Sequence, residues 1–420
     1  MKGRPKFHAQ VDDEGRLVLP WEAVSRFGLK PGVQLEIEDG GNFLRLRRPI
    51  THLAKVYIEP TNACNLECRA CIRNIWDEPI GQMSGKTFDR IIEGLESFSP
   101  KPTVFFGGFG EPLFHPNIVD MVARVKALGT TVELITNGTL LSPEMSRQLI
   151  EAGLDMLWAS LDGATPESYA DVRLGAALPE VVTNLRNFRN TLALFDDVDV
   201  YSAKPHIGIV FVAMKRNISD LPSVMRLGYE LGASRFLVTH VLPYVTEICD
   251  EALYTRVLTD ISYHSPLTGL DLPKLDINDL TSKTLYEIMQ WCHDMRFGGA
   301  SLKEAYDLCP FVDRGATVIG WEGGLSPCLP LLHNHVSFLH DKERVSRRYL
   351  VGNVSERNLN RLWKDPQYEA LRARVEAFDF SPCTFCGACE FFEKNEEDCF
   401  GNTFPTCGGC LLAQGLIQCP

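Results

Sequence analysis

The middle of the chain, residues 51–302, alternates short apolar runs with longer runs of helical periodicity. The apolar runs, which we predict to be strands, cover residues 56–59, 103–106, 132–136, 156–160, 207–212 and 236–241. Helical patterns lie between them, for example over residues 84–98 and 116–128. Strand–helix alternation of this kind indicates a parallel sheet covered by helices. Six units are too few for an eightfold barrel, so we expect an α/β fold with a partial, open (β/α)6 TIM-like barrel.

Residues 1–50 form a separate unit of short strands in this prediction. A hairpin over residues 8–20 turns at Asp13, a short helix follows over 21–29, and a second hairpin over 34–49 turns at residues 39–41. The sequences GRLVLP at 15–20 and GLKPG at 28–32 resemble the AbrB/SpoVT swapped-hairpin family. That resemblance implies a dimerisation or docking module, and many members of the family bind DNA.

Residues 303–420 change character, since cysteine, glycine and proline become frequent and periodicity fades except near residues 359–378, where we expect a helix. A tail of this composition needs metal centres in place of a large hydrophobic core. We therefore divide the chain into an N-terminal unit at 1–50, a barrel at 51–302 and a cysteine-rich domain at 303–420.

Composition limits the possible partners. The net charge of −12 gives the whole molecule no electrostatic affinity for nucleic acid or an anionic membrane. No apolar run reaches the length of a membrane span, and the N-terminus lacks the pattern of a secretory signal. We expect a cytoplasmic protein, and in a reducing compartment clustered cysteines are more often metal ligands than disulfides.

The strongest motif is Cys64-x3-Cys68-x2-Cys71, directly after the first barrel strand. Thiolates bind iron–sulfur clusters, and three ligands on a cubane leave one iron open for a small molecule. This spacing is similar to the hallmark of the radical S-adenosylmethionine (SAM) superfamily. The resemblance implies a 4Fe–4S cluster that reduces SAM and releases methionine and a 5′-deoxyadenosyl radical. The alternative is a zinc knot or buried thiols, although no fourth zinc ligand lies nearby.

Further motifs follow the next strands. After the second strand, residues 107–112 read GGFGEP, which resembles the SAM-binding GGEP motif in a longer GGxGEP form. Glycines there let the backbone approach a ligand closely. By the same resemblance, Asn137 and Ser160 contact SAM and Arg173 faces its carboxylate. The predicted cofactor-binding residues are Gly107, Gly108, Gly110, Glu111, Pro112, Asn137, Ser160 and Arg173. Asp162 is equally compatible with a turn or a functional role.

Nine cysteines follow residue 300, and they resemble the SPASM extension, which carries two auxiliary 4Fe–4S clusters. The resemblance implies ligands among Cys309, Cys328, Cys383, Cys386, Cys389, Cys399, Cys407, Cys410 and Cys419. The spacing after Cys383 departs from the usual SPASM block, so the assignment of ligands to each cluster stays open. Structural zinc is the alternative, because two CxxC units suit a zinc ribbon. Cys249 and Cys292 stand alone and are interpreted as packed thiols.

The substrate is addressed only by resemblance. The residues from Asp398 to the end and the stretch 106–116 resemble radical SAM maturases of tungsten-containing aldehyde ferredoxin oxidoreductases. Leu329 occupies the position where sulfatase-maturing members carry an acidic residue, which disfavours that activity. The expected partners are SAM, an electron donor such as ferredoxin or flavodoxin, and a protein or cofactor substrate, with a tungsten oxidoreductase as the candidate that the resemblance implies.

Two other classes remain open. One is a maturase that crosslinks a ribosomal peptide or forms a thioether in it, with residues 1–50 presenting the peptide. The other is a DNA-binding redox regulator, favoured only by ten Lys and Arg against seven Asp and Glu in residues 1–55. None of the histidines at 115, 240, 333 and 335 is assigned a role, because lone histidines are more often structural.

Overall fold

The computed structural model describes residues 7–27, 29, 35, 37–39, 44–46, 48–195, 205–259, 275–289, 296–297, 300–301, 309–339, 342–386 and 389–419. All six predicted barrel strands form and pair in parallel in chain order. They are β5 (Lys55–Ile58), β6 (Thr103–Phe106), β7 (Val132–Thr136), β8 (Met156–Ser160), β9 (His206–Ala213) and β10 (Ala233–His240). β10 begins three residues earlier than predicted, because its exposed start, Ser234 and Arg235, breaks the apolar run.

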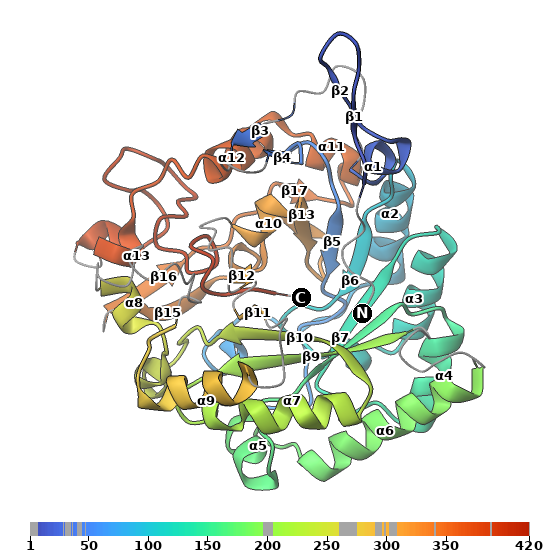
Figure 1. Ribbon diagram of the computed structural model, residues 1–420, viewed down its shortest axis with the longest axis vertical. Helices are drawn as coiled ribbons and strands as arrows, with labels where there is room; N and C mark the ends of the chain where they lie inside the picture. Colours follow the sequence, from blue (N-terminus) through green and yellow to red (C-terminus); the bar gives the residue numbers. More distant parts are fainter. Residues whose placement is uncertain are drawn as a thin grey trace.

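Helices cover the outer side of this sheet, as predicted for a parallel barrel (Figure 1). They are α2 (Gly85–Glu96), α3 (Ile118–Ala127), α4 (Pro143–Glu151), α5 (Pro166–Val172), α6 (Leu178–Phe195) and α7 (Leu221–Glu230). The local sequence of α2 explains why a helix forms there. The Ser84 hydroxyl caps its first turn by accepting from the Thr87 N–H, and Phe88, Ile91 and Leu95 form its buried stripe. The described elements downstream of β10 are α8 (Thr255–Thr259), α9 (Asp279–Met289), β11 (Arg296–Phe297) and β12 (Ala300–Ser301).

The C-terminal region continues the barrel sheet. β13 (Ala316–Ile319) follows α10 (Pro310–Asp313) and pairs in parallel with β5, and β14 (Gly324–Ser326) and β17 (Gly352–Asn353) extend the edge. A separate hairpin joins β15 (His335–Leu339) to β16 (Lys342–Ser346). The predicted boundary at residues 302–303 lies outside the described residues.

The prediction of one helix near residues 359–378 was wrong, because two helices occupy that stretch. α11 (Leu359–Trp363) ends before Pro366, and α12 (Pro366–Glu376) begins there. Proline lacks the N–H that would continue a helix, but it suits the first turn of a new one. The Asp365 carboxylate caps α12 by accepting from the Gln367 N–H.

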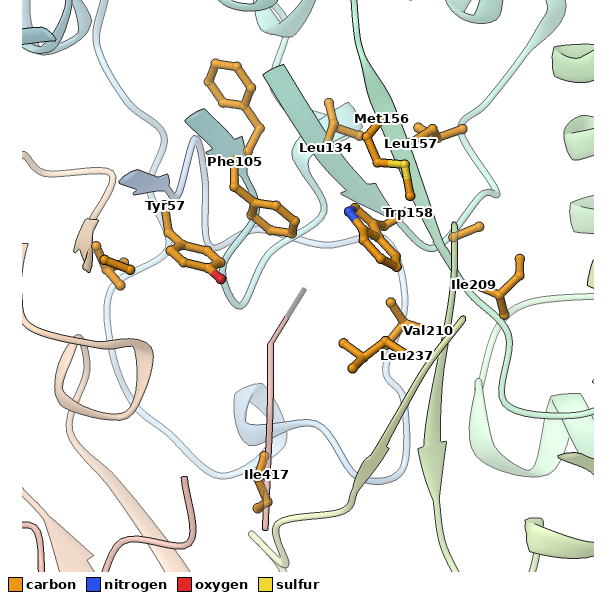
Figure 2. Packing of buried hydrophobic residues seen from close by; sticks show 14 of the residues in the cluster. Tyr57, Phe105, Leu134, Met156, Leu157, Trp158, Ile209, Val210, Leu237 and Ile417 are labelled. Atoms are coloured by element: carbon orange, nitrogen blue, oxygen red, sulfur yellow. The ribbon is translucent and has the colours of Figure 1, made fainter. Parts of the chain in front are cut away.

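The segment 411–419 occupies the inside of the barrel. Figure 2 shows Tyr57, Phe105, Trp158, Val210 and Leu237 facing the strand-like stretch that carries Ile417. The Gln418 N–H donates to the Thr239 hydroxyl at 2.9 Å. Arg314 donates to the Cys419 carbonyl at 2.8 Å and to the Gln418 side chain at 3.0 Å. A segment far along the chain therefore lies inside the barrel, against the side chains of its strands.

The N-terminal unit has the predicted order of elements. β1 (Gln10–Val11) pairs with β2 (Leu17–Val18), α1 (Trp21–Arg26) follows, and β3 (Ile37–Asp39) pairs with β4 (Leu44–Leu46). Its apolar side chains are unusually exposed, with Trp21 at 75% and Val11 at 70%. Among the described helices, none is long and apolar enough to cross a membrane.

Candidate active site

Cys64, Cys68 and Cys71 lie on the loop that follows β5, at the carboxyl edge of the sheet. The loop is fixed by its neighbours. Arg69 forms an ion pair with Asp171 at 3.0 Å and another with Glu247, and the Asn65 amide donates to the Thr139 hydroxyl at 2.8 Å. Three thiols are thus held against the ends of β7 and α5.

The surroundings of these thiols fit an anionic cluster. The Asn137 amide reaches the Cys64 sulfur and the Arg173 guanidinium reaches the Cys68 sulfur, each at 3.8 Å. Burial raises the pKa of the Cys71 thiol to about 11 and also raises that of Cys64. Buried thiols of this kind become thiolates when iron replaces their protons. The three cysteines that the sequence predicted therefore lie near one another, beside an amide and a guanidinium that suit metal-bound sulfur.

The glycine-rich loop 107–112 packs directly on the cluster loop. A side chain at Gly110 would meet the Thr61 carbonyl at 2.1 Å, and one at Gly108 would meet the Glu59 carboxylate at 2.7 Å. The Glu111 N–H donates to the Ala63 carbonyl at 2.9 Å. Only glycine allows the two loops to approach this closely.

Glu111 joins this loop to β7. Its buried carboxylate accepts from the Thr136 hydroxyl and the Asn137 N–H, both at 2.8 Å, and from the Leu113 N–H. Burial raises the pKa of Glu111 to about 6, against the opposing effect of these donors. Pro112 begins the short 3-10 turn that follows. The sequence motif thus fixes Asn137 beside Cys64.

Arg173 and Ser160 complete the set. Arg173 donates to the Asp162 carboxylate at 2.6 Å, and Asp162 in turn accepts from the Val212 N–H at 2.7 Å. Asp162 is therefore a positioning partner for Arg173 as well as a turn residue. Ser160 ends β8 and is buried, and its hydroxyl makes no hydrogen bond within the described ranges, which leaves it available to a ligand.

The C-terminal cysteines divide into two groups. Cys309, Cys328, Cys407 and Cys410 form the first, because burial raises the pKa of Cys328 and the other three thiols add to the rise. Cys309 precedes α10, Cys328 follows β14, and Cys407 and Cys410 share one turn. Three distant segments thus bring four thiols together, the number of ligands that a cubane needs.

The second group surrounds Cys383. Burial raises the pKa of this thiol, and Cys399 and Cys389 add to the rise. Cys386 lies on the same short helix, α13 (Cys383–Cys386), and is exposed together with Cys389 and Cys399. A second set of four ligands therefore lies near the surface.

Cys419 stands apart from both groups. Its electrostatic partners are Arg314, Lys55 and, more weakly, Cys410. Cys249 donates to the Val245 carbonyl, as expected of a packed thiol, and Cys292 lies outside the described residues. Among the nine predicted ligands, Cys419 is thus the one that lies outside both groups.

Arg344 is buried between the two groups. Its guanidinium donates to the carbonyls of Phe392 and Lys394 and interacts with Cys410, Cys383 and Cys407. No described carboxylate pairs with it. A buried cation requires an anionic partner, and thiolate-bound clusters supply negative charge at this position.

Two kinds of metal centre use thiolate ligands. A zinc site gathers its ligands about 2.3 Å from one ion, whereas a cubane binds each thiolate through a different iron. Within the ranges given above, no three His, Cys, Asp or Glu side chains are arranged to hold a single metal ion.

Sequence reasoning missed a buried pair beside this site. Glu59 and His333 contact each other at 2.9 Å, although they are 274 residues apart. No local pattern signalled this contact, since His333 was one of several lone histidines. Only Gly108, which must leave room for Glu59, hinted at a crowded position.

Comparison with known proteins agrees with this geometry. The sequence profile of the Radical SAM superfamily matches residues 58–192. The chain is 30% identical over 368 residues to the "Tungsten-containing aldehyde ferredoxin oxidoreductase cofactor-modifying protein" of Pyrococcus furiosus, covering 87% of this chain and 96% of that protein. The chain belongs to the radical SAM superfamily. The SPASM profile, an iron–sulfur cluster-binding domain, matches residues 309–390 of this radical SAM enzyme.

A second relative is named as a maturase. The "Mycofactocin maturase MftC" of Mycobacterium ulcerans is 29% identical over 354 residues, 83% of each chain. Among solved structures, Streptococcus suis SuiB bound to S-adenosylmethionine has a TM-score of 0.53 at 16% identity, covering 82% of this chain and 72% of that chain. The radical SAM fold, SAM as cofactor and 4Fe–4S clusters follow for this enzyme.

Proposed function

We propose that this radical SAM enzyme matures a tungsten-containing oxidoreductase or its cofactor. The observation that carries the proposal is the similarity to the Pyrococcus furiosus protein described above, 96% of whose length is covered by the match. The relative's printed name describes modification of the cofactor of a tungsten-containing aldehyde ferredoxin oxidoreductase. The same resemblance at residues 106–116 and after Asp398 supports it.

In this proposal the barrel residues have distinct roles. Cys64, Cys68 and Cys71 hold the SAM-binding cluster, which supplies the electron that cleaves SAM. The glycine-rich loop, Asn137 and Ser160 hold SAM above it. Arg173 is anchored by Asp162 at 2.6 Å, so its remaining N–H groups are fixed toward the cluster ligand and the SAM carboxylate. Ion pairs of Arg69 keep the cluster loop closed over this space.

The two C-terminal ligand sets hold auxiliary clusters. Because Cys386, Cys389 and Cys399 are exposed, the second set is the entry point for electrons from a cytoplasmic ferredoxin or flavodoxin. The N-terminal unit, with its exposed Trp21 and Val11, forms a dimer contact with a second copy. DNA binding is not part of this proposal, because the SAM-binding residues would serve no purpose in a pure sensor.

The test is anaerobic incubation of reconstituted enzyme, SAM and a low-potential reductant with the tungsten oxidoreductase produced without this enzyme. We expect 5′-deoxyadenosine formation to rise when the oxidoreductase is added, together with aldehyde oxidation by the oxidoreductase. The Cys64→Ala enzyme is the control and should give neither. An oxidoreductase that is fully active without this enzyme contradicts the proposal.

A second candidate is a peptide maturase, favoured by the match to a mycofactocin maturase over 83% of the chain. In that case the N-terminal unit presents the peptide. Co-purification of the full chain with a short leader-bearing peptide, and SAM cleavage stimulated by that peptide alone, would favour this activity over the first.

A further inference from the structure

The glycine-rich loop carries two residues more than the short GGEP form, Phe109 and Gly110, and the Phe109 side chain contacts His333 of the C-terminal domain. The Phe109 N–H donates to the Glu59 carboxylate at 3.0 Å. Glu59 follows β5 directly, is completely buried, and lies five residues before Cys64. A buried carboxylate costs free energy unless each oxygen has a partner.

The second oxygen of Glu59 is bound by His333. The Nε2 atom donates to this oxygen at 2.9 Å, because a carboxylate only accepts. His333 is 5% exposed and lies five residues after Cys328, a ligand of the first auxiliary set. Its Nδ1 atom has no hydrogen bond and faces the Glu78 carboxylate at 3.9 Å. One carboxylate thus joins the SAM loop to the C-terminal domain.

Three aromatic rings close the junction. Trp76 lies edge-on to His333 at 4.6 Å and to Phe109 at 5.4 Å, and Phe109 lies 5.8 Å from His333. Trp76 follows the cluster loop, Phe109 belongs to the glycine-rich loop, and His333 belongs to the C-terminal domain. Edge-to-face packing of this kind excludes water and strengthens the buried ionic contact.

We propose that Glu59 and His333 are positioning residues that lock the SAM-binding loop to the C-terminal domain. The inference rests on the proposed role of residues 107–112 in holding SAM. If His333 is removed, Glu59 keeps only the Phe109 N–H and its charge is left without a partner. The loop then shifts, and SAM affinity falls although no SAM-contacting group has been changed. The C-terminal domain therefore contributes to SAM binding as well as to electron transfer.

The test uses the reconstituted full-length enzyme and SAM itself as the probe. His333→Leu should raise the dissociation constant for SAM by about tenfold or more, as expected when a buried hydrogen bond to a charged group is lost. The electron paramagnetic resonance spectrum of its reduced cluster should respond less to SAM, at unchanged iron content. His333→Gln, which keeps an N–H donor, should recover most of the affinity.

The matched control is His335→Gln, because His335 is a buried imidazole two residues away that bonds the His333 carbonyl at 3.1 Å, and glutamine keeps a donor for this bond. It should bind SAM as the wild type does. If His333→Leu loses its clusters, Phe109→Ala gives the decisive measurement, since it removes the ring contacts from the loop side and should also weaken SAM binding.

Three outcomes overturn the proposal in different ways. If His333→Leu binds SAM normally while Gly110→Ala binds it poorly, Glu59 and His333 have no positioning role. The SAM-binding role of residues 107–112 then still stands. Normal affinity in Gly110→Ala itself removes the loop assignment and the positioning role with it. Equal loss in His335→Gln and His333→Leu indicates general damage and also refutes the specific role.

Discussion

The cysteines of the barrel and those of the C-terminal domain reach their sites in opposite ways. Cys64, Cys68 and Cys71 come from one loop after one strand, while the first auxiliary set draws its ligands from residues 309–410. A local loop needs only β5 and its neighbours to form. The distant set needs α10, β14 and the turn at Cys407 to be in place together. The three barrel cysteines are therefore close together in the chain itself, although Arg69 ties their loop to Asp171 and Glu247. The auxiliary site depends on the complete fold for the positions of its cysteines as well.

Removing the local ligands gives the largest expected effect. Cys64→Ala, Cys68→Ala and Cys71→Ala should each abolish 5′-deoxyadenosine formation, because SAM cleavage requires the barrel cluster. Iron content should fall from about 12 to about 8 per chain, since each cubane holds four irons. Cys249→Ala is the control and should keep both. Retained SAM cleavage in Cys64→Ala would refute the assignment.

The distant ligands should separate into two sets when tested singly. Cys407→Ala and Cys383→Ala should each lose about four irons, from different clusters, whereas Cys419→Ser should lose none. Iron analysis with Mössbauer spectroscopy distinguishes these outcomes. Loss of a cluster in Cys419→Ser would mean that this residue, and not one of the eight, is a ligand.

A subtler change tests the electrostatic link between the auxiliary sets. Arg344→Gln removes the buried cation that interacts with Cys410, Cys383 and Cys407. Both auxiliary midpoint potentials should become more negative, because reduction adds charge that no cation then offsets. A redox titration followed by electron paramagnetic resonance measures the shift. Arg348→Gln, at a surface ion pair with Glu322, should leave the potentials unchanged.

The smallest effect concerns pH. Burial lowers the pKa of His335 to about 4, so folding favours its neutral form. Its contribution to stability is complete above about pH 6.5, the ordinary value. The contribution is lost as the pH falls toward 4, by about 3 kcal/mol in total. Urea unfolding of His335→Gln should therefore depend less on pH over this window than that of the wild type. Equal slopes would contradict the buried neutral imidazole.

Local patterns predicted the elements that depend on neighbouring residues. Three of the six barrel strands, β6, β7 and β8, have the predicted bounds, and the glycine-rich loop lies where its motif placed it. The division of the stretch 359–378 into two helices could also have been predicted, because Pro366 is typical of the first turn of a helix.

Long-range contacts were not predictable from the sequence. The pairing of β13 with β5, the Glu59–His333 contact and the division of the cysteines each join residues far apart in the chain. Their side chains carry no periodic signal, since the free energy of each contact depends on the complete fold. The sequence shows how many cysteines are available as ligands after residue 300, but not which of them lie together in the fold.

The placement of residues 411–419 inside the barrel has a consequence for synthesis. Cys71 and Cys419 are separated by 348 residues. At typical translation rates of about 5–20 residues per second, about 17–70 seconds pass between them. For that time the ligand loop exists on a nascent barrel whose interior lacks residues 417–419. We therefore expect iron and sulfide to reach the three thiols more readily before these residues enter the barrel than afterwards.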